Sequence, residues 1–443
     1  MGGRRRRQRV PDGEFQAEID GMAHDGRGIA RVDGKATFVH GALPGETVSF
    51  RYLKRRRNHD EGQVVSVLEA SADRVEPRCA HYGICGGCGL QHLEPTAQIA
   101  SKQAMLLDNL HQIGKVSPGK VLPPLTGDSA WGYRRKARLG VKDVARKGKV
   151  LVGFRERGSS FVADLDTCHV LHPRVGELLP ALSDLVGSLS ISRRLPQIEM
   201  AMDDERCVLI LRILDPLSEY DEQLLNQFQA GKDVVFYLQP GGPETVRPLG
   251  TGVDLHYHLP AYDVTLGFLP GDFTQVNSDV NRKMIDRAIE LLDLQSEDRV
   301  LDLFCGIGNF TLPIARGCTH VVGVEGDAGL VSRARQNAVL NRLDNVEFFT
   351  ADLYGDLPAE PWRTGHFDKA VLDPPRSGAI QVLPLLPEMG IGRIVYVSCY
   401  PGTLARDAGE LVDRHGYRLV SAGVMDMFPH TAHVESIALF ERG

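Results

Sequence analysis

The sequence predicts a multidomain protein of the α/β class. Its 443 residues exceed the roughly 100 to 200 that one domain usually needs. Residues 13–69 alternate short β-type runs with Gly and Asp turns and have no helical period. After residue 275, strand-like and helical segments alternate, which is typical of a mostly parallel sheet covered by helices on both faces. We therefore expect domains of different architecture at the two ends of the chain.

The β-type runs of residues 10–70 predict a small closed β-barrel. Residues 95–113 carry apolar side chains at three- and four-residue spacing, which predicts a helix. From about 130 to 265 the pattern is mixed, with β-type runs around a helical segment near 174–190. We assign a central α+β domain to residues 71–94 and 128–268. A C-terminal α/β domain takes residues 95–127 and 269–443, where the inclusion of residues 95–127 is implied by the family resemblance given below.

The composition is that of an ordinary soluble globular protein, with 42% hydrophobic and 24% charged residues. No window approaches the roughly 18 uninterrupted apolar residues of a membrane span, and the first residues lack the apolar core of a secretory signal. Eight cysteines in a chain of this length do not indicate a secreted disulfide scaffold. We therefore expect a cytoplasmic protein with reduced thiols, with no membrane contact and no obligate protein partner.

Positive charge is concentrated locally although the net charge is −6. Residues 4–9 and 51–57 are basic, and residues 134–157 contain ten Lys and Arg against two acidic residues. Each segment alone would usually be a solvated face. Three of them in the first 160 residues of a net-acidic chain favour a surface that binds a polyanion such as RNA.

Several polar residues follow predicted strands of the C-terminal domain, where an open α/β sheet binds its ligands. Gly306 and Gly308 come after the strand 299–304, and Glu325 ends the next strand. Such a turn lets backbone approach a ligand, and such an acid binds ribose hydroxyls; a helix-capping carboxylate is the alternative. Only G-x-G is present, without the third glycine of a dinucleotide site, so S-adenosylmethionine fits better. Asp373, in "VLDPPRSG", is held by two prolines, although this could be only a rigid turn.

Cys399 ends the fifth strand of this series, in "IVYVSCYPGTL". A buried structural cysteine is the usual alternative for such a thiol. The sheet order should bring Cys399 near Asp373 and near Glu435 of the last strands. A thiolate and a base beside a methyl donor match one reaction, because carbon 5 of uracil attacks a methyl sulfonium only after a thiolate has added to carbon 6. Cys399 would be that nucleophile, and Glu435 would be the base that removes the carbon-5 proton.

Five motifs strengthen this interpretation: "FTQVN" (273–277), "DLFCGIGNF", "DPPRSG", "SCYPGTLARD" and "HVES". In order and spacing the chain resembles the RNA uracil-C5-methyltransferase family from about residue 10 to its end. The resemblance implies a Rossmann-like S-adenosylmethionine-dependent domain, with Cys399 as nucleophile and Glu435 as base. Tyr400 and Asp352 stand where the family often has Asn. The implied contacts to S-adenosylmethionine are Gln275, Phe304, Asn309, Glu325, Asp352 and Asp373.

A cysteine-rich loop, "CAHYGICGGC", contains Cys79, Cys85 and Cys88, and Cys168 is a candidate fourth ligand. The spacing does not choose between zinc and an iron–sulfur cluster. A Cys/His zinc site using nearby histidines and an unliganded reduced cluster are the alternatives. The family resemblance implies a [4Fe-4S] cluster on these four cysteines. The strand-end or core cysteines match no catalytic position and are interpreted as structural: Cys207, Cys305 and Cys318.

The N-terminal segment resembles a TRAM domain, an RNA-binding barrel. A TRAM-like barrel together with the cysteine cluster resembles the family members that methylate uridine 1939 of 23S rRNA, which makes 23S rRNA the expected partner. Another 23S uridine and the T-loop uridine of tRNA are alternatives within the same chemistry. A non-catalytic RNA chaperone is an alternative from a different class. A radical iron–sulfur enzyme is disfavoured because four cysteines leave no open iron.

Overall fold

The structure, a computed structural model, describes residues 9–355 and 360–443 and divides into two compact units. Unit 1 contains the chain up to Met105 together with residues 156–159 and 428–433, and unit 2 contains the remainder. Most of the basic segment 4–9 lies outside the described residues. The assignment of three domains stays a prediction.

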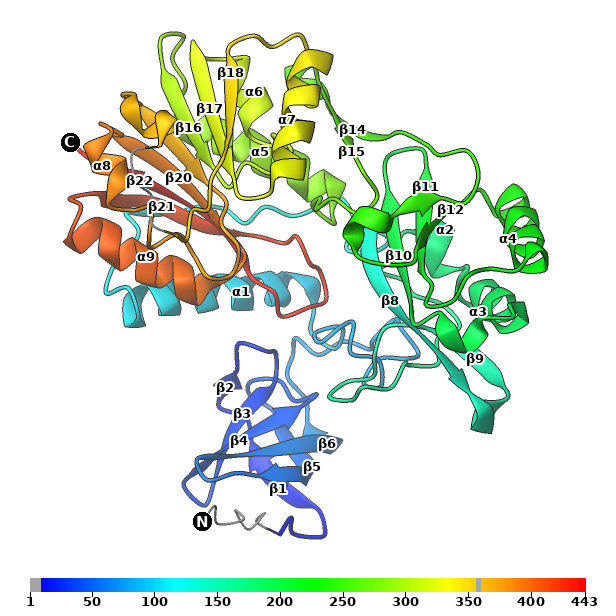
Figure 1. Cartoon of the computed structure of the whole chain (residues 1–443). Helices are drawn as coiled ribbons and strands as arrows, with labels where there is room; N and C mark the ends of the chain where they lie inside the picture. The colour runs from blue at the N-terminus through cyan, green and yellow to red at the C-terminus, as the bar shows by residue number, and fades with distance from the viewer. Residues whose placement is uncertain (1–8, 356–359) are drawn as a thin grey trace, which may run out of the picture. The chain divides into compact units, whose positions relative to one another are not determined.

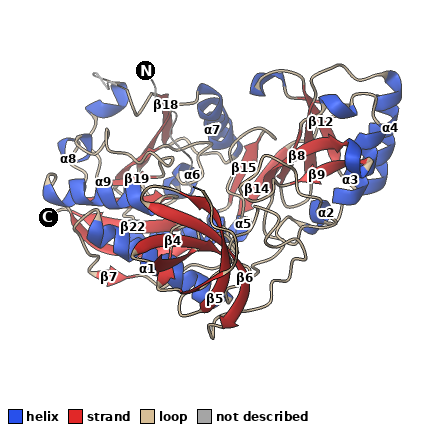
Figure 2. Cartoon of the chain, turned by 90° about the horizontal axis from the view of Figure 1, so that it is seen from below, coloured by secondary structure: helices blue, strands red, loops and turns tan. Residues whose placement is uncertain are grey.

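Unit 1 begins with a six-stranded sheet in the order β1-β5-β6-β4-β3-β2 (Figure 1). Its long strands β5 and β6 are strongly bent (Figure 2). The Asp20 amide donates to the Ile29 carbonyl of β3 at 2.8 Å, so the chain leaving β1 reaches the other side of the sheet. The all-β organisation predicted for residues 10–70 is thereby confirmed. The strands are β1 (Phe15–Glu18), β2 (Gly21–Met22), β3 (Gly28–Val32), β4 (Lys35–His40), β5 (Thr47–Arg55) and β6 (His59–Glu69).

The strands of this sheet and their connections share a small apolar core. Four of its six buried side chains come from strands β3, β4 and β5, and the two on β5, Val48 and Phe50, are two residues apart and so face the same side. Phe50 is fully buried and lies edge-on to Tyr52, with 5.0 Å between ring centroids. Gly62 faces the Phe50 ring so closely that an added Cβ would lie 2.6 Å from it. The cluster consists of Ile19, Ala30, Val39, Ala42, Val48 and Phe50.

Besides residues 156–159, the rest of unit 1 contains the cysteine-rich loop, the first turns of helix α1 (Pro95–Gln112) and the segment 428–433. Gln98 joins the three. Its amide donates to the Leu90 and Leu93 carbonyls, and its carbonyl accepts from the His430 amide at 3.0 Å. The His430 carbonyl accepts in turn from the Gly89 and Leu90 amides. A helix over 95–113 was predicted, and α1 confirms it within one residue.

Unit 2 contains a sheet in the order β13-β12-β11-β10-β8-β9, together with helices α2, α3 and α4. It is antiparallel except for the pair β11–β12. The expected helix near 174–190 is interrupted after Gly176. The elements are β8 (Lys136–Val144), β9 (Lys149–Gly153), α2 (Pro173–Gly176), α3 (Leu179–Ser188), β10 (Gln197–Met202), β11 (Cys207–Arg212), α4 (Glu219–Lys232), β12 (Val235–Gln239) and β13 (Arg247–Pro248).

The second sheet of unit 2 has the order β18-β17-β16-β19-β20-β22-β21-β7. Strands β16 to β20 are parallel, and β22 is antiparallel to both of its neighbours. The predicted mostly parallel sheet is confirmed. Its strands are β7 (Lys120–Val121), β16 (Arg299–Leu303), β17 (His320–Glu325), β18 (Val346–Thr350), β19 (Lys369–Leu372), β20 (Arg393–Ser398), β21 (Arg418–Met425) and β22 (Glu435–Glu441).

Helices lie on both faces of this sheet (Figure 1). From β16 the chain moves outward one way to β17 and β18, and the other way to β19 and β20. Because such crossovers are right-handed, the helices of the two halves lie on opposite faces. The hairpin β14 (Leu255–Leu259) and β15 (Val264–Phe268) precedes the first of these helices. The helices are α5 (Ser278–Leu292), α6 (Thr311–Ala315), α7 (Ala328–Leu340), α8 (Leu385–Glu388) and α9 (Pro401–Asp413).

Residues 114–125 belong with this sheet. The Leu122 amide donates to the Ala422 carbonyl, and Gly114 packs so closely on α9 that its added Cβ would lie 2.3 Å from the Ala405 carbonyl oxygen. In the part of the chain that the structure describes, no helix has the length and apolar character to cross a membrane.

Candidate active site

The carboxyl ends of the parallel strands gather most of the predicted site residues at one edge of the sheet. Phe304 follows β16, Glu325 ends β17, and Asp373 follows β19. Cys399 follows β20, and Glu435 begins β22. Ser398 and Ser436 are direct partners in the ladder between β20 and β22, so their neighbours Cys399 and Glu435 lie at the same end of that antiparallel pair. The structure thus brings together the two residues predicted to be nucleophile and base.

Cys399 is half-buried among acidic groups. The pKa of its thiol is raised to about 11, mainly by burial and then by the negative charges of Glu435 and Asp373, while the Arg376 guanidinium lowers it. Glu435 is only 9% exposed. Burial also raises the pKa of Asp373 to about 7. A thiol in these surroundings stays protonated at neutral pH until a ligand or a proton acceptor changes its environment.

The turn after β16 approaches Glu325 through its backbone. The Gly306 amide donates to Glu325 Oε2 at 3.1 Å, and the Asp327 amide donates to Oε1 at 3.0 Å. Gly306 and Gly308 have φ angles of 55° and 94°, and Phe304 has a φ of 66°. Left-handed backbone is natural for the glycines and strained for phenylalanine. The two amides fix the carboxylate and leave its other lone pairs for a ligand.

Asn309 is held by two residues that the sequence did not single out. The Tyr257 hydroxyl donates to Asn309 Oδ1 at 2.7 Å, and the Asn281 amide donates to the same oxygen at 3.2 Å. Asn309 Nδ2 donates back to Asn281 Oδ1 at 3.0 Å. Tyr257 comes from β14 and Asn281 from α5, so no spacing rule connects them with Asn309. Only the tertiary fold reveals them as positioning residues.

A tyrosine also connects two of the strand ends. The Tyr354 ring lies 5.7 Å from the Phe304 ring, centroid to centroid. Its hydroxyl donates to the Gly378 carbonyl at 3.0 Å and accepts from the Ser377 hydroxyl at 2.9 Å. Its amide donates to Asp352 Oδ1 at 3.0 Å, and Asp352 itself is exposed. Tyr354 therefore ties the turn after β18 to the loop that carries Asp373.

The loop after β19 is anchored from α9 by a fully buried carboxylate. Asp407 Oδ2 accepts from the Ala379 amide at 2.7 Å and from the Tyr396 hydroxyl at 2.6 Å. The Arg406 guanidinium pairs with Oδ1. This network explains the "TLARD" part of the motif that follows Cys399: its last residue holds the loop that contains Asp373.

Gln275 lies on the segment that leads into α5. It is half-buried, and its neighbour Phe273 is 69% exposed. The Arg135 amide donates to the Val276 carbonyl at 2.9 Å, which fixes this segment beside the start of β8.

A second buried carboxylate, Asp302, lies within β16. Its residue is fully buried, Oδ2 accepts from the Thr311 hydroxyl at 2.5 Å, and Oδ1 has no partner. Its pKa is raised to about 7, mainly by burial and with a contribution from the charges of Asp373 and Glu325, although the hydrogen bond from Thr311 lowers it. Asp302 is the first residue of the motif "DLFCGIGNF", but the sequence alone assigned it no role.

The cysteine-rich loop of unit 1 presents sulfur ligands on a compact backbone. Cys79, Cys85 and Cys88 are half-buried, and the Gly87 amide donates to Cys85 Sγ at 3.4 Å. Arg157 donates to the Cys88 carbonyl at 3.0 Å and lies over the Tyr82 ring. Cys168 belongs to unit 2. Among the described residues, no group of three or more His, Cys, Asp or Glu side chains is placed to hold a metal ion. The donor set alone, soft thiols with a backbone amide on sulfur, suits an iron–sulfur cluster or zinc.

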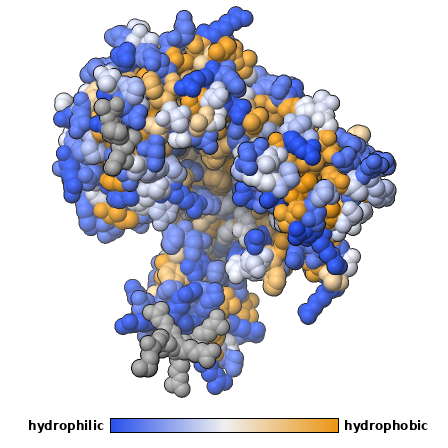
Figure 3. All heavy atoms as spheres, viewed as in Figure 1, coloured by the Kyte–Doolittle hydropathy of each residue, from blue (hydrophilic) through white to orange (hydrophobic). Residues whose placement is uncertain are grey.

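Most of the charge in the basic segment 51–57 is paired. Lys54 and Arg56 share Glu61, at 3.5 and 2.9 Å, and Arg55 shares the buried Asp60 with Lys35 of β4. Within the described residues Arg57 has no ion pair. On the face shown in Figure 3, the β1–β6 part is mostly hydrophilic with smaller apolar patches. The segment 134–157 is also partly paired, because Arg135, Arg138, Lys147 and Lys149 all contact carboxylates.

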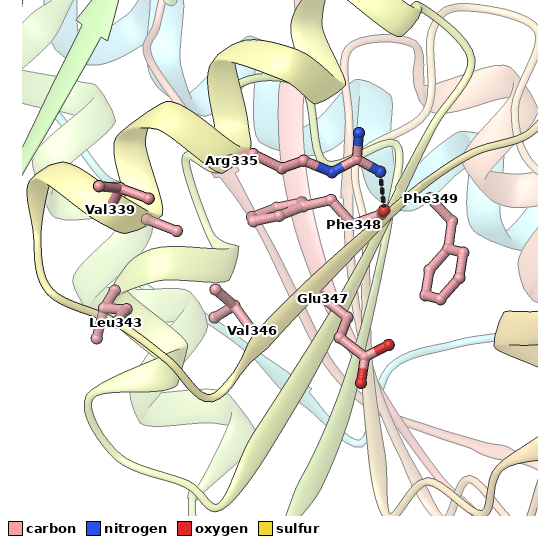
Figure 4. Close-up of a pocket in the computed structure, with 8 residues that line it drawn as sticks. Arg335, Val339, Leu343, Val346, Glu347, Phe348 and Phe349 are labelled. Atoms are coloured by element: carbon pink, nitrogen blue, oxygen red, sulfur yellow. Dashed lines mark hydrogen bonds between the residues drawn. The ribbon is translucent and has the colours of Figure 1, made fainter.

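A pocket of about 410 Å³ lies away from the strand-end residues, between α7 and β18 (Figure 4). Arg335 crosses it and donates to the Phe348 carbonyl at 2.5 Å. Because β18 is an edge strand of this sheet, the arginine satisfies a carbonyl that has no neighbouring strand to bond to. None of the predicted site residues lines the pocket. Its lining is Arg335, Ala338, Val339, Leu343, Val346, Glu347, Phe348 and Phe349.

Known protein families match both the C-terminal and the N-terminal part of the chain. Residues 259–353 and 362–443 match the family described as tRNA (Uracil-5-)-methyltransferase, and residues 14–65 match the TRAM domain. Three relatives carry the name 23S rRNA (uracil(1939)-C(5))-methyltransferase RlmD. The protein of Alkalilimnicola ehrlichii is 56% identical, and those of Xanthomonas campestris and Stenotrophomonas maltophilia are 55% identical. Each alignment covers 99% of this chain and 99% of the relative.

Among solved structures, the chain is similar to the Pyrococcus abyssi tRNA (uracil-54, C5)-methyltransferase in complex with S-adenosyl-L-homocysteine. The TM-score is 0.73 over 96% of this chain and 100% of that chain, at 22% identity. At this identity the similarity concerns the fold. The C-terminal methyltransferase fold and the N-terminal TRAM domain predicted from the sequence are confirmed.

Proposed function

Because this chain belongs to the family of 23S rRNA (uracil(1939)-C(5))-methyltransferases, we propose that it transfers a methyl group to carbon 5 of uridine 1939 in 23S rRNA. The methyl donor is S-adenosylmethionine. The observation that carries the proposal is the placement of Cys399 and Glu435 at the same end of the β20–β22 pair, beside Asp373. A thiol and a carboxylic acid in this relation suit covalent catalysis on a pyrimidine ring.

S-adenosylmethionine supplies an electrophilic methyl group when it is bound. The Cys399 thiolate adds to carbon 6 of the uracil, and the electron pair of the 5,6 double bond moves toward carbon 5 and the carbonyl. Carbon 5 would then attack the methyl group of the bound donor, the bond between that methyl and the sulfonium sulfur would break, and S-adenosylhomocysteine would leave. Glu435 removes the proton from carbon 5, the double bond reforms, and the carbon–sulfur bond to Cys399 breaks. The thiolate is regenerated and the ring leaves with one additional methyl group.

The contacts to S-adenosylmethionine are assigned to residues at the strand ends. Glu325, already oriented by the Gly306 and Asp327 amides, binds the ribose hydroxyls. Phe304 and Asn309 line the turn after β16, and Asp373 lies at the edge next to the nucleophile. Asp352 has the weakest support, because its carboxylate is exposed and bonded within its own turn. The full set is Gln275, Phe304, Asn309, Glu325, Asp352 and Asp373.

The proposal is tested by tritium release from RNA labelled at uracil carbon 5. A 23S fragment containing uridine 1939, the same fragment with cytidine at that position, and a tRNA transcript are compared. Release from the first alone, abolished in Cys399→Ala and kept in Cys318→Ala, is expected. Cys318 is a matched control because it is a buried cysteine whose thiol donates to the Ile314 carbonyl. Release from the tRNA alone would overturn the target, and no release from any RNA would favour a non-catalytic RNA chaperone.

We also propose that Cys79, Cys85, Cys88 and Cys168 hold a [4Fe-4S] cluster. The support is the donor set: three half-buried thiols in one glycine-rich loop, with an amide on one sulfur and Arg157 beside the loop. Bound there, the cluster would hold the cysteine-rich loop in a fixed conformation. Protein purified without oxygen should contain about four iron atoms per chain and absorb broadly near ~400 nm. Zinc in place of iron would assign the same cysteines to a zinc site, and a metal-free protein would overturn both.

A further inference from the structure

Two asparagines, one in helix α7 and one at its C-cap, make hydrogen bonds to the hairpin β14–β15 of the kind that a neighbouring strand would make. Asn337 Oδ1 accepts from the Gly267 amide at 2.8 Å, and its Nδ2 donates to the Gly267 carbonyl at 3.1 Å. Asn341 does the same with Thr265, at 2.7 Å in both directions. Thr265 and Gly267 are two residues apart on β15, so their backbone groups face the same edge. Side-chain amides thus satisfy an edge that β14 does not cover.

Only Asn337 also makes a side-chain hydrogen bond to a segment outside both the hairpin and α7. Asn337 Nδ2 also donates to the Ile307 carbonyl at 3.1 Å, in the middle of the turn Gly306-Ile307-Gly308. The second donation of Asn341 stays inside α7, at the Asn337 carbonyl. Both residues are buried, with 2% and 9% exposure. The side-chain hydrogen bonds of the two residues therefore differ only in the carbonyl that accepts the second Nδ2 donation, and for Asn337 this carbonyl lies in the turn that carries Asn309 and approaches Glu325.

A third residue on the same helix face holds the segment that follows β15. Arg333 precedes Asn337 by four residues, and its guanidinium lies 2.6 Å from Asp272 Oδ2. Residues four apart lie on one face of a helix. Asp272 leads directly to Gln275, another assigned contact to S-adenosylmethionine. The face formed by Arg333, Asn337 and Asn341 thus connects the glycine turn with the segment of Gln275.

We propose that Asn337 is a positioning residue for the methyl-donor site. It fixes the Ile307 carbonyl, and with it the glycine turn, at a set distance from the β15 segment. The inference rests on the proposed function, because the turn has a ligand to position only if the chain binds S-adenosylmethionine. A purely structural role for the two asparagines predicts that both matter equally and only for stability.

The test compares Asn337→Asp with Asn341→Asp. Both changes are isosteric, and each removes the Nδ2 donor to one strand carbonyl and to one further carbonyl. We measure the melting temperature, binding of S-adenosylhomocysteine by calorimetry, and kcat and KM for S-adenosylmethionine with a saturating 23S fragment. In Asn337→Asp we expect KM to rise about tenfold, the effect of one lost hydrogen bond to a bound loop, with kcat within about twofold. In Asn341→Asp, KM should stay within about twofold of the wild type. Its melting temperature should nevertheless fall by about as much as that of Asn337→Asp.

An equal change of KM in both variants, or in neither, would overturn the proposal. If the buried carboxylate prevents folding, the neutral pair Asn337→Ser and Asn341→Ser is measured in the same way and decides by the same contrast. A wild-type protein that neither binds S-adenosylhomocysteine nor methylates RNA would overturn the proposed function itself. A wild-type protein that does both, with unchanged KM in the Asn337 variants, would overturn only the positioning role.

Discussion

The β1–β6 sheet and the β16–β22 sheet treat their charged side chains in opposite ways. In the first, buried Asp60 lies between Lys35 and Arg55, and Glu61 lies between Lys54 and Arg56. In the second, Asp302 is fully buried with one hydroxyl partner, and Asp373 and Glu435 lie close enough to the Cys399 thiol to raise its pKa. Paired charges stabilise a fold, whereas acids whose pKa is raised by burial, here Asp302 and Asp373, are typical of a site of chemistry. The comparison locates the reaction in one sheet and leaves the other for binding.

The largest effect should come from removing the carboxylate beside the thiol. In Glu435→Gln we expect turnover to fall about 10²- to 10⁴-fold, because no base removes the carbon-5 proton. Methylated RNA should remain bonded to Cys399, so a covalent RNA–protein complex should accumulate on denaturing gels. Glu441→Gln, the same change at the other end of β22, is the control and should turn over normally. Loss of turnover without any covalent complex would assign Glu435 a role before the thiolate adds.

The same substitution should make the free thiol more reactive. Because the pKa of Cys399 is about 11, its alkylation by iodoacetamide should accelerate about tenfold per pH unit up to that pH. Glu435 contributes to the raised pKa, so Glu435→Gln should be alkylated several-fold faster than wild type at pH 8, although it methylates more slowly. The measurement is the rate of mass increase at the peptide containing Cys399. Equal rates in wild type and variant would show that the Glu435 charge does not reach the thiol.

Much of this arrangement was predictable from the sequence, since it depends on where strands end. The strand expected at 299–304 is observed at 299–303, and Cys399 follows β20 as the apolar run indicated. What the sequence did not reveal depends on register and tertiary contact. Lys35 meets Asp60 across 25 residues, and Asn337 meets Ile307 across 30. Tyr257 is an ordinary β residue until its hydroxyl reaches Asn309. Local patterns contain no information about such partners.

The contrast between the two buried carboxylates predicts opposite effects on stability. The pKa of Asp302 is raised to about 7, so the folded state favours the protonated acid, and stability present at low pH is lost as the pH rises through 7. Asp302→Asn removes this loss, so its melting temperature should gain on wild type between pH 5 and pH 8, by the equivalent of roughly a few kcal/mol at most. Asp60→Asn should instead lower the melting temperature at pH 7, because it leaves Lys35 and Arg55 without their shared partner. Thermal unfolding across this pH range measures both. Parallel pH profiles for wild type and Asp302→Asn would remove Asp302 from the comparison.

The smallest expected effect is on RNA affinity and comes from the β1–β6 sheet, where Glu61 neutralises two cations that could contact phosphate. Glu61→Gln frees Lys54 and Arg56, so RNA affinity at low salt should rise about two- to fivefold and the salt dependence should steepen. Glu69→Gln changes the same charge on the same strand, but the Glu69 carboxylate accepts from the Thr47 hydroxyl and pairs with no cation in the described residues. It should therefore have a smaller effect and leave the salt slope unchanged. Arg57→Ala should weaken binding and reduce the slope by about one. Fluorescence anisotropy with a 23S fragment over a range of KCl concentrations provides these slopes, and equal slopes for Glu61→Gln and Glu69→Gln would show that RNA does not contact the cations held by Glu61.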